Sequence, residues 1–258
     1  MAPQDLLLAL RDQNPLVHCI TNYVAMNIAA NVVLAAGASP AMVHEQEEMA
    51  EFTPICGALT LNIGTLSKPW ATAMLTAART ANDKNIPWVL DPVAHFISGY
   101  RKGVAQDLLA LRPTILRGNA SEIMALAGEA GAGKGVDSGD SVDAAENAAR
   151  ALAHSYGAVV AVTGPVDFVT DGAQSAKVSG GSDIMPMITA LGCSQTALMG
   201  AYAASGPAFE AALATLAHFK VAGTKAAQKA EGPGSFQMHF LDALAATQPA
   251  DLAHVIVT

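Results

Sequence analysis

Four short polar segments hold the side chains that could do chemistry together in this sequence, and three of them follow apolar runs directly. The segments are Asp91-Pro92, Arg117-Gly-Asn-Ala-Ser-Glu122, Thr163-Gly164 and the loop Thr189-Ala-Leu-Gly-Cys193. Together they supply two carboxylates, a guanidinium, a hydroxyl, a thiol and the expected start of a helix. This combination suits a magnesium-bound polyphosphate beside a small alcohol.

The loop that ends at Cys193 lies inside a stretch, 184–209, that has no charged side chain. The pattern predicts that an apolar segment becomes a helix at this point. The first N–H groups of a helix are unpaired and its positive dipole end points outward, so the position suits an anion. We expect Gly192 and Cys193 to be catalytic, with the thiol pKa lowered from about 8.5. The alternative is a small buried residue at a helix start.

The other segments also have purely structural interpretations. Asn119 followed three residues later by Glu122 is typical of a helix capping box. Asp91 before a proline is a common way to leave a strand, and Arg117 could merely neutralise a nearby carboxylate. Their occurrence at the ends of successive predicted strands is what favours a shared site.

The elements that must position these residues alternate along the chain. Short apolar runs predict buried strands at 16–20, 41–43, 58–62, 88–90, 114–116 and 158–162. Helical patterns occupy 23–36, 67–84, 103–110, 120–128 and 141–156. After a polar turn at 170–172 a short extended piece is expected, followed by three more helices at 193–205, 207–229 and 235–246. We predict an α/β fold of one domain, 1–258, with a mostly parallel central sheet and helices on both faces. Ligands in such folds bind beyond the carboxyl ends of the strands.

Composition excludes several classes of function. The net charge of -8 argues against a nucleic-acid partner, which requires a basic face. The two long uncharged stretches, 13–44 and 184–209, are broken by polar residues, prolines and glycines, so we expect no membrane span. The N-terminus lacks a signal-peptide pattern, and the three cysteines are isolated. We therefore expect a cytoplasmic protein without disulfides.

A segment that nearly fits a phosphate-binding loop is rejected. Residues 128–135 read Gly-Glu-Ala-Gly-Ala-Gly-Lys-Gly, but the last position has no hydroxyl for magnesium, and the segment follows a predicted helix rather than a strand. Only 14% of all residues are charged while 52% are hydrophobic. This balance is explained by a well-buried fold or by contacts between subunits.

The sequence resembles the hydroxyethylthiazole kinases of the ribokinase-like superfamily over almost the whole chain. The matching segments are Pro15–Asn22, Leu34–Met42, Leu61–Leu66, Leu90–Val93, Arg117–Ile123, Gly135–Ser138, Val162–Gly164 and Glu231–Phe236. The resemblance implies that the chain phosphorylates the hydroxyl of 4-methyl-5-(2-hydroxyethyl)thiazole with ATP and Mg²⁺, in thiamine salvage. It also implies a homotrimer with active sites between subunits.

The resemblance assigns roles position by position. Met42, Asn22 and Ala190 match substrate-binding positions, Arg117 and Thr163 match ATP-binding positions, Asp91 and Glu122 match the acidic residues near magnesium, and Cys193 matches a cysteine that stands where sugar kinases have their base. 

Three departures from the family pattern affect what the resemblance implies. The family usually has a glycine where this chain has Ala190, followed here by the bulkier Leu191. Residues 94–99 replace a small, glycine-rich segment, and Pro165 replaces a common acidic residue. Two other functions therefore stay open: a kinase for another small alcohol such as a hydroxymethylpyrimidine, and a nucleotide- or thiazole-binding protein with little turnover.

Overall fold

The computed structural model describes residues 1–128 and 138–257, and within this part of the chain nine strands form one sheet. The strands are β1 (Leu16–Ile20), β2 (Ser39–Ala41), β3 (Ala58–Asn62), β4 (Trp88–Asp91), β5 (Ile115–Asn119), β6 (Val159–Thr163), β7 (Asp167–Thr170), β8 (Ser175–Val178) and β9 (Ile256–Val257). Their spatial order is β2-β1-β3-β4-β5-β6-β7-β8-β9. Strands β1 to β6 are parallel, and β7, β8 and β9 continue the sheet antiparallel.

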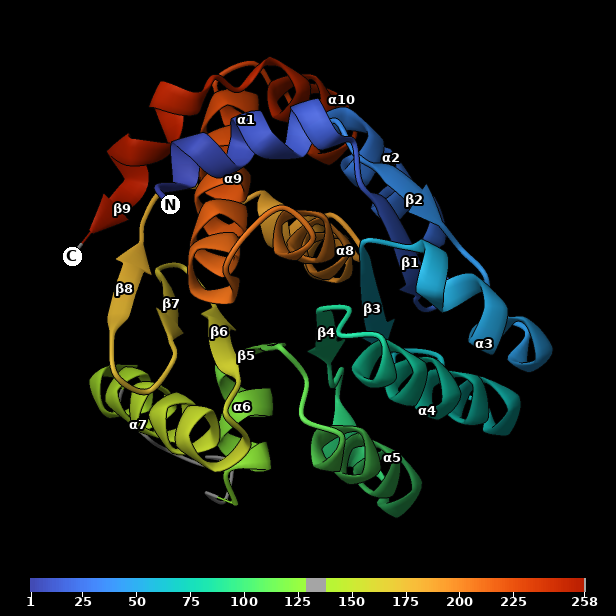
Figure 1. The fold of residues 1–258 in the computed structure, drawn as a ribbon. Helices are drawn as coiled ribbons and strands as arrows, with labels where there is room; N and C mark the ends of the chain where they lie inside the picture. The colour runs from blue at the N-terminus through green and yellow to red at the C-terminus, as the bar shows by residue number, and fades with distance from the viewer. Residues whose placement is uncertain (129–137, 258) are drawn as a thin grey trace.

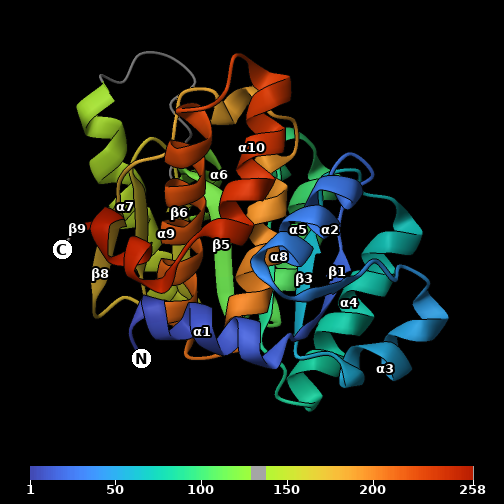
Figure 2. The same ribbon diagram turned by 90° about the horizontal axis from the view of Figure 1, so that it is seen from above.

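Ten α-helices occur in the same described ranges and cover both faces of this sheet (Figure 1). They are α1 (Pro3–Gln13), α2 (Met26–Ala36), α3 (Met49–Phe52), α4 (Lys68–Asp83), α5 (Gly99–Ala110), α6 (Ala120–Leu126), α7 (Ser138–Tyr156), α8 (Leu191–Ala203), α9 (Ala208–Ala227) and α10 (Pro233–Ala246). Helices α1, α2, α8, α9 and α10 form one layer, seen in front of the strands in Figure 2, and α3 to α7 lie on the opposite face. No helix among the described residues has the length and apolar character needed to cross a membrane.

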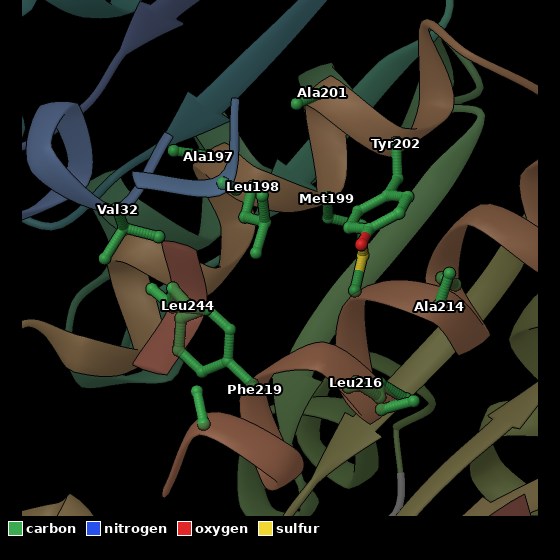
Figure 3. Close-up of a cluster of buried hydrophobic side chains, with 14 of the residues drawn as sticks. Val32, Ala197, Leu198, Met199, Ala201, Tyr202, Ala214, Leu216, Phe219 and Leu244 are labelled. Carbon is green, nitrogen blue, oxygen red and sulfur yellow. The ribbon is translucent and has the colours of Figure 1, made fainter. Parts of the chain in front are cut away.

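Each face of the sheet has its own hydrophobic core. One core joins α1, α2, α8, α9 and α10 to the sheet, and the other joins α4, α5, α6 and α7 to its opposite face. Figure 3 shows part of the first core, where the fully buried Tyr202 of α8 lies near Ala214 of α9, while Phe219 and Leu244 meet further along. Most side chains of α8 are buried on every side, which explains why its sequence lacks the polar stripe of a surface helix.

The α/β prediction is confirmed, with shifts at individual elements. The strand predicted at 41–43 lies at Ser39–Ala41, and α5 begins at Gly99 rather than at 103, since Ser98 caps it by accepting from Arg101 N. The predicted turn at 170–172 joins β7 to β8, where β8 is the short extended piece expected after the turn and β7 was not predicted. The rejected glycine-rich loop at 128–135 and the matching segment at 135–138 lie almost wholly outside the described residues.

Candidate active site

Most of the candidate site residues gather at one edge of the sheet because the parallel strands all end there. The residues at or just after these carboxyl ends are Asn22 after β1, Met42 after β2, Asn62 on β3, Asp91 on β4, Asn119 on β5 and Thr163 on β6. The register of the ladder confirms the alignment, since Asn62 pairs with Asp91 and Asn119 pairs with Thr163. The prediction that the strand ends meet along one edge is therefore confirmed.

Helix α8 starts at this edge and packs against β1, β3 and β4. Its N-cap is Ala190, whose backbone is left-handed with φ 58° and ψ 14°. The helix begins at Leu191, two residues earlier than predicted, so Cys193 is its third residue. The N-terminal N–H groups of α8 therefore lie where the sequence analysis expected an anion.

Asp91 is the buried centre of the site. Its Oδ2 accepts hydrogen bonds from Asn62 Nδ2 and from Thr196 Oγ1, both at 2.7 Å, and lies 3.5 Å from Arg117 Nη1. Its Oδ1 is buried and has no hydrogen-bond partner among the described residues. Burial raises the pKa of Asp91 to about 6, although the guanidinium of Arg117 opposes the shift.

Arg117 connects three elements through one guanidinium group. Its Nη2 donates to Thr163 Oγ1 at 2.8 Å and to Gln195 Oε1 at 3.3 Å, so the side chain links β5 to β6 and α8. The group lies over Gly192, where a Cβ atom would come within 2.9 Å of Nη2. Arg117 thus places a fixed positive charge beside the start of α8.

Glu122 is held by backbone donors on two loops. Its Oε2 accepts from Asn119 N and its Oε1 from Ala94 N, both at 2.9 Å, while Asn119 Oδ1 accepts from Glu122 N at 2.9 Å. The predicted capping box is present. The hydrogen bond from Ala94 N to Glu122 Oε1 is not part of the capping box, because it links the segment after β4 to the start of α6.

Cys193 belongs to a chain of amide side chains. Asn22 Nδ2 donates to Cys193 Sγ at 3.3 Å and to Asn62 Oδ1 at 2.8 Å, and Asn62 in turn donates to Asp91. The expected fall in the thiol pKa is wrong. Burial and the negative charge of Asp91 raise the pKa of Cys193, so the thiol stays protonated near neutral pH.

A cavity of about 480 Å³ opens beside this network. Arg117, Thr163 and Gly192 line one part of it, and Asp167 of β7 and Lys220 of α9 line another. The volume lies in the range of small-molecule sites, about 300–1,000 Å³. The cavity is large enough for a ligand that reaches from the guanidinium toward α9.

The structure brings together most of the predicted site residues, with Met42 at a distance along the edge. Met42 is half-buried and packs against the core that contains α2 and α8. Sequence reasoning missed five polar residues that complete the site, namely Asn62, Asp167, Gln195, Thr196 and Lys220. The strand-end criterion that selected Asp91 would also have selected Asn62, since both end adjacent parallel strands.

Comparison with known proteins agrees with a phosphoryl-transfer site. A family model described as the hydroxyethylthiazole kinase family matches residues 7–249. The chain belongs to this family. A hydroxyethylthiazole kinase of Roseobacter denitrificans is 78% identical over 99% of this chain and 100% of its own length, and one of Rhizobium johnstonii is 59% identical over 95% and 92%. The resemblance noted in the sequence is confirmed.

Solved structures support the fold of this hydroxyethylthiazole kinase family member. A hydroxyethylthiazole kinase from Pyrococcus horikoshii superposes with a TM-score of 0.92 at 35% identity, covering 99% of this chain and 97% of its own. A pyridoxal kinase from Bacillus subtilis gives a TM-score of 0.63 at 17% identity, covering 80% of this chain and 90% of its own, a likeness of fold alone. The expected fold is thereby confirmed, and membership of the family makes the chain a phosphotransferase.

Proposed function

We propose that the chain transfers the terminal phosphoryl group of ATP to the hydroxyl of 4-methyl-5-(2-hydroxyethyl)thiazole, as part of thiamine salvage. The observation that carries the proposal is the position of Arg117, which lies against Gly192 at the start of α8, contacts Thr163 and lines the cavity. Phosphoryl transfer has a loose transition state, so a site needs mainly positioning and charge neutralisation. A fixed guanidinium beside a helix N-terminus supplies both.

The cavity and the amide chain divide the site into two halves. Arg117 and Thr163 line the cavity, so we assign the nucleotide to that side. Asn22, Met42 and Ala190 belong to the other side, where the thiazole alcohol would approach Cys193. The start of α8, with Gly192, lies between the two halves. Its N–H groups would bind the phosphoryl group while that group passes from ATP to the alcohol.

Magnesium is assigned on the fit of two carboxylates. Asp91 has a buried oxygen without a partner among the described residues, and oxygen ligands are what Mg²⁺ prefers. Glu122 is the second acidic residue, although both of its oxygens already accept backbone N–H groups. Since Mg²⁺ usually keeps several waters and needs only one or two carboxylates, these residues fit it. When bound, the ion would neutralise charge on the phosphates.

Cys193 is assigned as a positioning group and not as a thiolate base. Its raised pKa keeps the proton on sulfur, and Asn22 donates to that sulfur. A weak proton acceptor suffices for the alcohol because the loose transition state develops little charge on the attacking oxygen. The thiol then contributes less to the rate than Arg117.

The proposed assembly rests on the resemblance, and the proposed location rests on the sequence composition. We propose a homotrimer with active sites between subunits, and the mass measured by light scattering tests it. We also propose a cytoplasmic location.

Turnover with Mg-ATP and 4-methyl-5-(2-hydroxyethyl)thiazole tests the function, with the phosphorylated product followed by mass spectrometry. Product from the wild type, and its loss in a folded Arg117→Ala variant, is the expected result. A wild type that binds ATP or the thiazole in a calorimeter yet forms no product would overturn the proposal. A hydroxymethylpyrimidine offered in the same assay separates the two alcohol substrates.

A further inference from the structure

Lys220 is a buried cation whose ammonium group has only oxygen partners among the residues that the structure describes. It lies in the middle of α9 and is 5% exposed. Its Nζ donates to Gly164 O at 2.7 Å and Pro165 O at 3.0 Å, and lies 3.4 Å from Asp167 Oδ1. These three contacts fix the position of the ammonium group relative to the three oxygens.

The oxygens all belong to the turn that joins β6 to β7. Asp167, which is 2% exposed, also closes this turn from the inside, because its Oδ1 accepts from Gly164 N at 2.8 Å. Two side chains therefore stabilise the conformation of the turn. They are the carboxylate of Asp167, at the end of the turn, and the ammonium group of Lys220, which reaches the turn from α9.

A purely stabilising role explains this arrangement poorly. Removing two charges from water costs several kcal/mol per ion, so a buried ion pair is weak evidence for stability. Burial raises the pKa of Asp167 even with Lys220 beside it, which shows that the charge is held at a cost. The buried pair of Lys220 and Asp167 is better explained by the conformation that it imposes on the turn between β6 and β7.

The turn forms part of the wall of the cavity. Thr163, Gly164, Pro165, Asp167 and Lys220 all line it, and Thr163 accepts a hydrogen bond from Arg117. A shift of the turn would therefore move Thr163 and alter its hydrogen bond with Arg117.

We propose that Lys220, paired with Asp167, is a positioning residue that fixes the 163–167 turn in the geometry needed to bind the nucleotide. This inference rests on the proposed function, since it takes the cavity as the place of ATP. Neither residue touches the thiazole half of the site. Their effect should therefore fall on the nucleotide alone.

Steady-state kinetics of Lys220→Met, with ATP and the thiazole varied separately, tests the proposal. Methionine keeps the length of the side chain and removes the charge and the donors. We expect the KM for ATP to rise about ten-fold or more, as the loss of hydrogen bonds to a charged group implies, with the KM for the thiazole unchanged. Lys225→Met is the matched control, because Lys225 lies on the same helix in a half-exposed pair with Asp251. It should leave both constants as in the wild type.

A double variant separates positioning from folding. Lys220→Met leaves Asp167 as an unpaired buried charge, which can lower stability strongly. Lys220→Met with Asp167→Asn removes both charges and keeps an oxygen for Gly164 N, so its melting temperature should recover while its KM for ATP stays high. A double variant with the wild-type KM for ATP would overturn the proposal, as would a stable Lys220→Met with that KM.

The test also distinguishes this inference from the proposed function. A wild type that forms no thiazole phosphate refutes the function, and the dissociation constant of ATP from calorimetry then replaces the KM. Weaker ATP binding in Lys220→Met would still support the role of the pair. Equal ATP binding in wild type and variant would refute it.

Discussion

The guanidinium of Arg117 lies directly against Gly192, so that a methyl group at residue 192 would come within 2.9 Å of Nη2 and 3.2 Å of Nη1. Glycine at this place leaves room for a charge, and its backbone is in the first turn of α8. The position of the Arg117 guanidinium, on β5, therefore depends on the absence of a side chain at residue 192 of α8.

Gly192→Ala should therefore lower activity without lowering stability much. The added methyl must push the end of the flexible Arg117 side chain aside, while alanine is the better helix former. Losing one preorganised donor at an anion site costs about 10²–10³ in rate, and we expect kcat to fall toward that range. Turnover and thermal melting, measured on the same sample, check this. A variant with wild-type kcat would show that Arg117 need not hold this position.

Ala190→Gly should stabilise the protein. Ala190 is held in the left-handed region at φ 58°, which costs an L-residue about 1–2 kcal/mol and a glycine almost nothing. After allowing for the greater freedom of glycine in the unfolded chain, we expect a gain of about 0.5–1 kcal/mol in the free energy of unfolding. Urea unfolding measures it.

The matched control is the same change in a right-handed helix. Ala151 is exposed on α7, and Ala151→Gly should cost about 1 kcal/mol. Loss of stability in both variants would contradict the strain at residue 190. Activity that appears only in Ala190→Gly would favour the low-turnover binding protein.

Glu122→Ala should lose both stability and activity. Two backbone N–H groups, of Ala94 and Asn119, would lose their acceptor carboxylate, and the proposed magnesium site would lose one of its two carboxylates. Asn119→Ala breaks the same capping box and should cost about 1 kcal/mol, with a smaller loss of activity. Melting curves and turnover at limiting magnesium check both variants. Full activity of Glu122→Ala at limiting magnesium, with only a lower melting temperature, would reduce Glu122 to a cap.

Cys193→Ala should keep more activity than Arg117→Ala. The pKa of the thiol is raised by burial and by Asp91, so little thiolate exists for base catalysis or for reaction. Iodoacetamide should modify Cys193 more slowly than a free cysteine at pH 7.5. The Cys193→Ala variant, in which the buried Cys19 and Cys56 remain, measures the background modification of the other two cysteines. Rapid modification, together with a kcat loss equal to that of Arg117→Ala, would restore the thiolate hypothesis.

Acid should destabilise the fold through His218. Burial lowers the pKa of His218 to about 4, against 6.5 for an exposed imidazole, and Arg11, Lys225 and Asp251 are the charged groups around it. The unfolded chain binds the proton first, so the stabilisation is complete above pH 6.5 and is lost as the pH falls toward 4. His218→Gln should reduce the slope of unfolding free energy against pH by up to about 1.4 kcal/mol per pH unit in this window. Urea unfolding at several pH values measures the slope, and an unchanged slope would contradict the assignment.

The sequence predicted those parts of the fold that depend on local pattern. Apolar runs that end in Asp91, Arg117 or Thr163 are visible without a structure, because buried parallel strands need continuous hydrophobicity. Helix α1 and strands β7 and β9 were missed. Their segments are short or only partly buried, and pairing at the end of a sheet depends on contacts distant in the sequence.

Of the polar residues that sequence reasoning missed, Asn62 lies at a strand end beside Asp91 and could have been found by the same criterion. The others lie on β7, α8 and α9 and not at the ends of the parallel strands. Lys220 lies 53 residues beyond Asp167 in the numbering, and only the packing of α9 brings them together. The thiol pKa was wrong for a related reason. A helix N-terminus can be inferred from sequence, but the burial of Cys193 and the nearness of Asp91 cannot.

Strand β2 has a further consequence at the outer edge of the sheet. Ser39 N donates to Pro15 O on the side of β1, and since successive N–H groups of a strand alternate in direction, the nitrogen of Pro40 faces outward. Proline has no N–H to offer there, so an incoming strand would lack a donor at the middle of this three-residue edge. The edge is thereby protected against amyloid-like stacking and strand exchange.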